Sequence, residues 1–167
     1  MWSLILEKFE KHPAQKKVLK LLFERGFQVN NDGKVSSGSI EIAHTQLAKE
    51  AGVDRRVVDS TTEAILADDM LKSIFQNVHS IPFLRDVAPL LNLGVIIITP
   101  GDAANTGIIA DVAKVISEHG LSIRQAVSDD PYLTDEAKLT IITDEKVPGG
   151  VVDSLMKLNS VKGVSIY

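Results

Sequence analysis

The sequence predicts an α+β protein in two parts: a mainly helical first half, and a second half in which strands and helices alternate. Three observations point to this class. Apolar side chains in the first half recur at three- and four-residue steps, as they do along amphipathic helices. The apolar run Gly94–Thr99 lacks that period and is typical of a buried strand. Lys and Arg balance Asp and Glu over residues 1–91, so residues 92–167 carry the whole acidic excess behind the net charge of -4.

The composition limits the class of protein further. The chain has 167 residues, 44% of them hydrophobic, and no cysteine. We expect a folded core, and disulfides, thiolate zinc sites and a cysteine nucleophile are excluded. Residues 1–8 lack the basic stretch and cleavage pattern of a signal peptide, and no apolar run approaches the roughly 20 residues of a membrane span. We therefore expect a soluble, cytoplasmic protein without a membrane partner.

Residues suited to catalysis or metal binding are sparse. His44 and His79 have no acidic or histidine neighbour at ligand spacing. Asp129 and Asp130 are two adjacent carboxylates of the kind that bind a divalent cation or act as an acid/base pair. No nucleophile or partner histidine accompanies them, and a turn accounts for them. The sequence therefore predicts no catalytic residue, no metal site and no cofactor.

The first half contains one clear early helix, from about residue 14 to 25, with Pro13 in its first turn and Gly26 at its end. The lysines of this helix are either a solvated face or a contact to nucleic acid. Residues 30–33 are a strong turn and residues 36–39 a loop. Residues 70–78 alternate apolar and polar side chains, which predicts a half-buried strand that would complete a small wing.

Residues 42–66 carry a more specific pattern. Leu47 and Ala48 place an apolar stripe on one short helix, Gly52 can end it in the left-handed conformation, and Asp54 is suited to cap a second helix. This pattern of Leu-Ala, three residues, Gly-Val and a capping residue resembles the helix-turn-helix motif. The resemblance implies DNA contacts at the start of the second, recognition helix. The candidate DNA-binding residues are Arg55, Arg56 and Ser60.

Two carboxylates oppose that assignment. Asp59 and Glu63 lie on the face that would enter the major groove, where they repel phosphate. The alternative is therefore a winged-helix-like module that serves dimerisation or docks a partner protein. Both interpretations remain open from the sequence.

The two halves are expected to be separate domains, at residues 1–80 and 93–167. Residues 81–92 are the expected linker, in which Pro82 and Pro89 interrupt any helix. The high apolar content of this linker indicates that it packs against something, as a short helix between the two prolines.

The second half follows the order strand, helix, strand, strand, helix, strand. We expect strands at about residues 94–99, 121–127, 137–143 and 163–167, and helices at 106–119 and 148–159. This βαββαβ order predicts a four-stranded antiparallel sheet with both helices on one face, the ferredoxin-like arrangement. The fold class is thus α+β, with a helical or winged helix-turn-helix domain followed by a ferredoxin-like domain.

The segment from Gly107 to Gln125 resembles the core of the ACT domain, a small amino-acid-binding regulatory module. Gly107 matches the glycine of the family's ligand loop and Gly120 the glycine before its second strand. Thr106 stands where the family usually has proline, and Ala104 where a polar residue is usual. Gly107 allows a ligand close to the backbone, and the helix amino end favours its carboxylate. Asp102 or Asn105 would meet its ammonium group.

In this family, ligand sites form between two domains, so the resemblance implies a homodimer or higher homo-oligomer. The first set of expected ligand contacts lies on the loop and helix start, at Asp102, Ala104, Asn105, Thr106, Gly107 and Ile108. The second set lies on the neighbouring domain's second strand, at Ser122, Ile123, Arg124 and Gln125. Edge strands that seek partners also favour a dimer with a continued sheet.

The two halves together resemble the archaeal-type predicted regulators of amino-acid metabolism that join a helix-turn-helix to an ACT domain. The resemblance implies a transcriptional regulator in which a bound amino acid modulates DNA binding. The alternative is a regulatory subunit that docks on an amino-acid biosynthetic enzyme without binding DNA. An enzyme in its own right is the third and least supported interpretation.

Overall fold

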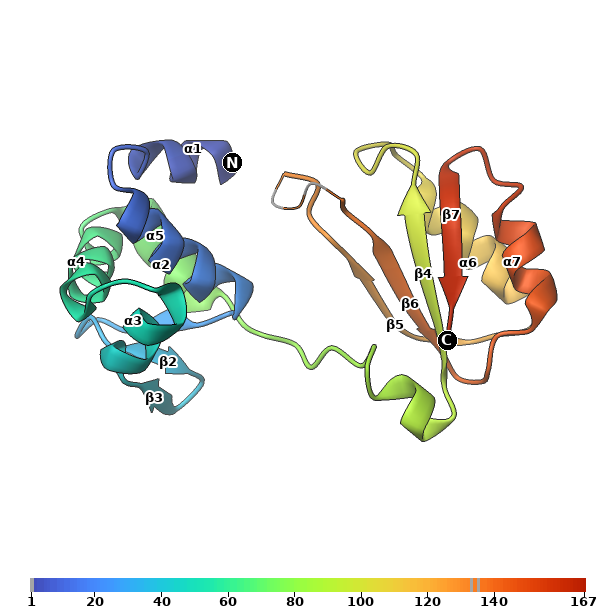
Figure 1. Ribbon diagram of the computed structural model, residues 1–167, viewed down its shortest axis with the longest axis horizontal. Helices are drawn as coiled ribbons and strands as arrows, with labels where there is room; N and C mark the ends of the chain where they lie inside the picture. Colours follow the sequence, from blue (N-terminus) through green and yellow to red (C-terminus); the bar gives the residue numbers. More distant parts are fainter. Residues whose placement is uncertain (1, 133, 135) are drawn as a thin grey trace. The chain divides into compact units, whose positions relative to one another are not determined.

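A computed structural model describes residues 2–132, 134 and 136–167 of the chain. The chain divides into two compact units, the first ending at Pro82 and the second beginning at Phe83 (Figure 1). Among the described residues, no helix is both long and apolar enough to cross a membrane.

The first unit combines five helices with a small antiparallel sheet of strand order β1-β2-β3, counted over the described residues. Its elements are α1 (Trp2–Lys8), α2 (Pro13–Glu24), β1 (Gln28–Val29), β2 (Val35–Ser37), β3 (Ile40–Ile42), α3 (His44–Ala51), α4 (Arg55–Leu66) and α5 (Asp69–Asn77). The helices bury their apolar stripes against one another. The buried side chains include Val18, Leu19, Leu22, Leu47, Val58, Ile65, Leu71 and Phe75. Burial of these stripes stabilises helices that are too short to be stable alone in water.

Helix α2 begins at Pro13 and is followed by Gly26 at φ 61°, close to the prediction. Residues 36–39, expected to be a loop, instead belong to the hairpin of β2 and β3, in which Val35 pairs with Ile42 and Ser37 with Ile40. The prediction of a loop was wrong because the serines sit at the tight end of a hairpin whose register is set by flanking apolar residues.

The predicted strand at residues 70–78 is also wrong, because this segment forms α5. The Asp68 side chain accepts hydrogen bonds from the backbone N–H groups of Met70 and Leu71 and so caps the helix. Leu71 and Phe75 lie one helical turn apart and are both buried. The alternation of polar and apolar residues was therefore a poorer guide than the cap and the four-residue spacing, and no wing arises from residues 70–78.

The second unit is a four-stranded antiparallel sheet of strand order β5-β6-β4-β7. Its elements are the 3-10 helix η1 (Ala88–Leu91), β4 (Gly94–Pro100), α6 (Ile108–Glu118), β5 (Ile123–Ser128), β6 (Leu139–Thr143), α7 (Gly149–Leu155) and β7 (Val161–Ile166). These strands and helices follow the expected βαββαβ order. Both helices lie on the same face of the sheet (Figure 1), where Val112 of α6 and Leu155 of α7 share one core with Ile96 and Ile141 of the central strands.

The expected linker at residues 81–92 is largely part of the second unit. The Leu84 backbone N–H donates to Gln125 Oε1 at 2.9 Å, and Ala88 is fully buried with Val95 and Ile142 on the sheet face that the helices leave open. A short 3-10 helix forms at Pro89, so the two prolines do not bracket a helix. The apolar content of the segment is explained by this packing, because burying it removes hydrocarbon from water.

Candidate functional site

The turn between α3 and α4 is built as the local sequence predicts. Gly52 ends α3 in the left-handed conformation, at φ 64°, and the Val53 N–H donates to the Ala48 carbonyl at 2.9 Å. Asp54 then adopts an extended backbone, and its Oδ1 accepts a hydrogen bond from the Arg56 N–H at 2.8 Å. Three residues therefore redirect the chain from one helix into the next and cap the second one.

Arg55 and Arg56 occupy the first turn of α4 and both are exposed, Arg55 with 65% of its side chain accessible. The amino end of a helix carries a partial positive charge, so cations here oppose the helix dipole. Helix stability therefore does not account for two arginines at this place. The buried side chains of the helix, Val58, Thr61, Thr62 and Ile65, lie on its other face.

Ser60 lies apart from the two arginines. Its hydroxyl accepts a hydrogen bond from Gln15 Nε2 of α2 at 2.9 Å and donates to the Val57 carbonyl at 3.1 Å. The side chain is half-buried. Of the three predicted DNA contacts, the structure leaves only the two arginines on the open surface.

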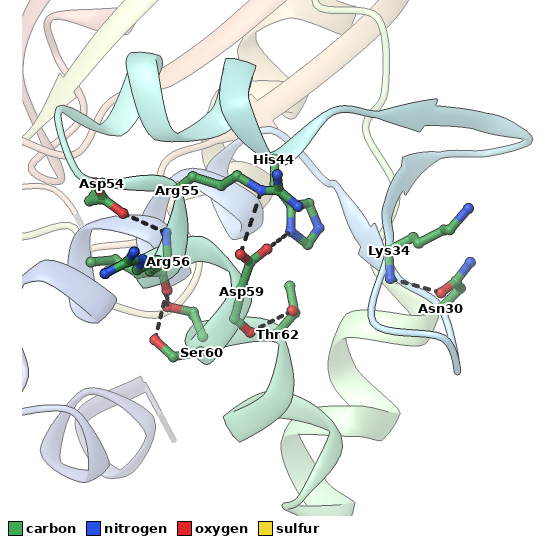
Figure 2. A network of polar contacts seen from close by, with 11 residues as sticks. Asn30, Lys34, His44, Asp54, Arg55, Arg56, Asp59, Ser60 and Thr62 are labelled. Atoms are coloured by element: carbon green, nitrogen blue, oxygen red, sulfur yellow. Dashed lines mark hydrogen bonds and ion pairs between the residues drawn. The ribbon is translucent and has the colours of Figure 1, made fainter.

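A polar cluster joins the start of α3 to the second turn of α4 (Figure 2). Asp59 Oδ1 lies 2.6 Å from His44 Nδ1, and Asp59 Oδ2 lies 3.5 Å from Arg55 Nε. His44 is only 17% exposed and Asp59 38%. Sequence spacing did not reveal this contact, because His44 and Asp59 are 15 residues apart and meet only when the two helices pack. In the described part of the chain, no group of three or more metal-ligating side chains is present.

The same cluster lines one side of a hollow of about 380 Å³ between the β2–β3 hairpin and the two helices. On its other side Lys34 Nζ lies 2.9 Å from Glu41 Oε2. The hydrogen bond and the charge of Glu41 hold the pKa of Lys34 above its ordinary value. The hollow is lined by Asp32, Gly33, Lys34, Glu41, Ile42, Ala43, His44, Thr45, Arg55 and Asp59.

The loop after β4 in the second unit is ordered by its own polar groups. Asp102 Oδ1 accepts a hydrogen bond from the Ala104 N–H at 2.9 Å, and the Asp102 carbonyl accepts one from the Asn105 N–H at 3.2 Å. Gly107 then takes a left-handed conformation, at φ 87°, and starts α6 without a side-chain cap. The first N–H groups of α6 have no intrahelical acceptor, so they are free to meet an anion.

A pocket of about 470 Å³ opens beside this loop and the amino end of α6. Its walls are mainly apolar, with three polar side chains. The lining residues are Pro100, Ala103, Asn105, Gly107, Ile108, Ile109, Ala110, Ala113, Ser128, Ala137, Lys138 and Leu139. Asn105, Gly107 and Ile108 are therefore predicted ligand residues that line a pocket, whereas Asp102, Ala104 and Thr106 lie on the loop outside the lining.

Ser128 and Lys138 were not predicted as ligand contacts. They reach the pocket because Ser128, the last residue of β5, pairs with Leu139, the first residue of β6. Neither has a recognisable spacing from the loop in the sequence. The register of the sheet, which depends on contacts distant in sequence, brings them there.

The second predicted set lies at the other end of β5. Ser122, Ile123 and Arg124 are exposed, and the Ser122 N–H donates to Asp144 Oδ1 at 2.9 Å. Gln125 is engaged by the Leu84 N–H in its own chain. Within one chain these residues do not line the pocket, so a site that combines the two sets requires a second copy of the chain.

No family model and no curated protein matches this sequence. Three solved structures are similar to it at low identity. They are a point mutant of the protein Rv3291c, at 15% identity over 92% of this chain and 89% of that one with a TM-score of 0.30; the transcriptional regulatory protein PF0864 from Pyrococcus furiosus, a member of the AsnC family, at 9% over 92% and 85% with a TM-score of 0.28; and an AsnC family transcriptional regulator from Agrobacterium tumefaciens, at 14% over 92% and 86% with a TM-score of 0.26. At such identities and TM-scores, the function has to be argued from the residues of this chain.

Proposed function

We propose that this protein is a non-enzymatic transcriptional regulator that responds to an amino acid. The first unit binds DNA as a helix-turn-helix, and the second is an ACT domain that binds a small amino acid in a homodimer or higher homo-oligomer. The observation that carries the proposal is the pair of exposed arginines on the first turn of α4, directly after a glycine turn and an aspartate cap.

The arginine pair is suited to the DNA backbone and to base edges. A guanidinium presents five N–H donors in a planar fork, which fits phosphate oxygens and the acceptor edge of guanine. The cost of placing cations at a helix amino end is offset when they meet phosphate. Of the two carboxylates that opposed this assignment, Asp59 is neutralised by contacts to His44 and Arg55, and Glu63 remains exposed.

The pocket beside α6 supports the sensor half of the proposal. Free backbone N–H groups at the start of α6 suit a carboxylate, Asn105 offers an amide oxygen to an ammonium group, and the apolar walls suit a side chain. Ser122, Ile123 and Arg124 would complete the site from a second copy. Regulation requires that the ligand prefer one arrangement of the DNA-reading units, and a coupling of about 1 to 3 kcal/mol is sufficient.

A second candidate function is a regulatory subunit that docks on a biosynthetic enzyme. Exposed Glu63 on α4 and Ile40, which is 70% exposed at the β2–β3 hairpin, favour a protein partner over DNA for this surface. Stoichiometric recovery of an enzyme by affinity purification, without any salt-dependent binding of DNA, is the result that would select this alternative.

The DNA half is tested with the double variant Arg55→Ala and Arg56→Ala and a control of equal charge change in the second unit, Lys157→Ala and Lys162→Ala. The control lysines are exposed. For the arginine variant, we expect binding of a labelled duplex to weaken about 10- to 100-fold, and the slope of log K against log salt to fall by about two. Equal effects of the two double variants, or none, would refute the assignment of α4 as the DNA-reading helix.

The sensor half is tested by calorimetric titration with each of the twenty amino acids, together with a thermal-shift assay. A ligand that binds only the folded chain raises the melting temperature, and at 100 times its Kd it adds about 2.7 kcal/mol to the free energy of unfolding. Absence of both heat and thermal shift with all twenty would exclude an amino-acid sensor.

A further inference from the structure

We propose that Asp59 is a positioning residue for Arg55, with His44 as its anchor. The carboxylate holds the guanidinium at the amino end of α4, and the histidine holds the carboxylate. The part of the proposal that concerns DNA affinity rests on the proposed function, whereas the ordering of Arg55 does not.

The first step is the geometry of Arg55 and Asp59. They are four residues apart on α4, so both side chains project from the same face of the helix. Asp59 Oδ2 lies 3.5 Å from Arg55 Nε. The helix dipole does not favour an arginine at this position, and a long exposed side chain has many rotamers. The nearby carboxylate is therefore the group that selects one orientation of Arg55.

The second step is the anchor. His44 is the first residue of α3, and its Nδ1 lies 2.6 Å from Asp59 Oδ1. Because the partner is a carboxylate, Nδ1 is the donor and carries the hydrogen. The other ring nitrogen, Nε2, is buried and has no hydrogen-bond partner among the described residues. The ring is thus held in place by its contact with Asp59 and by packing, and in return it fixes the rotamer of Asp59.

The third step is the division of the carboxylate between two partners. One oxygen faces His44 and the other faces Arg55, so the α3–α4 packing contact and the surface arginine share one side chain (Figure 2). A contact through Nε does not use all five N–H donors of the guanidinium, so an oriented Arg55 retains donors for an incoming phosphate. Ordering the side chain before binding lowers the entropy that binding would otherwise cost.

Glu63 provides a matched comparison. It is an exposed acid one helical turn beyond Asp59, and in the described part of the chain no ion pair involves it. Asp59→Asn and Glu63→Gln remove the same charge from the same helix at nearly unchanged volume. Only Asp59→Asn removes the group that faces both Arg55 and His44.

The first measurement needs no DNA. The ¹⁵N relaxation of the Arg55 Nε–H group reports its order on the picosecond to nanosecond timescale. We expect Asp59→Asn to lower its order parameter clearly, His44→Gln to lower it less, and Glu63→Gln to leave it unchanged. Asp59→Glu, which keeps the carboxylate, should restore part of the order. Unchanged order in Asp59→Asn would overturn the proposal.

The second measurement is DNA affinity, with a labelled duplex selected by the wild-type protein from a random pool. We expect Asp59→Asn to weaken binding about 3- to 10-fold, which is the range of coupled neighbouring groups, and Glu63→Gln to strengthen it about twofold by removing repulsion. In an Arg55→Ala background, Asp59→Asn should have no further effect. A loss of folding would lower affinity in that background too, so this cycle separates positioning from a structural role.

The outcomes separate the two proposals. If Asp59→Asn and Glu63→Gln both strengthen binding equally, Asp59 acts only as a repulsive charge and the positioning role for DNA is refuted. If the wild-type protein shows no salt-dependent binding to any duplex, the proposed function fails, and the relaxation of Arg55 still decides whether Asp59 orders it.

Discussion

The replacement of Gly26 by alanine should destabilise the first unit far more than the same replacement at Gly52. Both glycines follow a helix with nearly equal backbone angles, φ 61° and φ 64°. A Cβ at Gly26 would lie 2.3 Å from the Ser80 backbone nitrogen and 2.6 Å from the His79 carbonyl carbon. A Cβ at Gly52 would meet nothing within 4 Å. The pair therefore separates the cost of a left-handed alanine from the cost of a close approach between two backbone segments.

The magnitudes follow from these two terms. A left-handed L-residue costs about 1 to 2 kcal/mol, and the reduced freedom of the unfolded chain returns about 0.4 to 1 kcal/mol, so Gly52→Ala should cost about 1 kcal/mol. Gly26→Ala adds the displacement of backbone at residues 79–80, at about 1 to 3 kcal/mol as for other overpacked sites. We expect a total of about 2 to 4 kcal/mol.

The assay is urea unfolding followed by far-ultraviolet circular dichroism, with hydrogen exchange of α2 and α4 amides to assign the transition to the first unit. The m-value should stay constant, so that the shift in midpoint measures the change in free energy of unfolding. A Gly26→Ala variant no less stable than Gly52→Ala would show that the end of α2 and residues 79–80 are not in close contact.

Two further predictions concern aspartate caps. Asp54→Ala should lower the free energy of unfolding by about 1 kcal/mol, because it leaves the Arg56 N–H without its cap, whereas Asp54→Asn should change it little; urea midpoints of the two variants decide this. The pKa of Asp68 lies below its ordinary value because Lys8 donates to the carboxylate and the Leu71 N–H caps against it. The ionised form therefore stabilises the folded state above the unfolded pKa of about 3.9, and this contribution is lost as the pH falls through the folded value. Between about pH 5 and pH 2 the urea midpoint should fall less in Asp68→Asn than in the wild-type protein, and parallel curves would contradict the pairing.

Local rules were sufficient wherever the deciding contacts lie within a few residues. Gly52 and Asp54 end one helix and start the next through their own backbone angle and side chain, so they could be identified from the sequence. The run Gly94–Thr99 forms β4 because a continuous apolar segment of this length fits a central strand. The same kind of rule failed at residues 70–78, where alternation competed with an aspartate cap and a four-residue apolar spacing, and the helix formed.

The candidate sites were only half accessible to sequence reasoning. Arg55 and Arg56 could be found because their exposure follows from their place after the cap. The engagement of Ser60 with Gln15 could not, because these residues are 45 positions apart and meet only when α2 and α4 pack. Asn105 and Gly107 were found on the loop, while Lys138 came to the pocket through strand pairing.

The sequence by itself determined the order of most elements, the turn before α4 and the arginines at its start, because helix caps, glycine turns and apolar periods act over one or two turns of chain. The tertiary structure alone decided that Asp59 is paired with His44, that residues 83–92 pack on the open face of the sheet, and that Ser128 and Lys138 line the pocket. Each of these depends on packing between segments distant in the sequence, which no local preference specifies. That packing turns Asp59, which as an isolated charge would repel DNA, into the partner of an arginine.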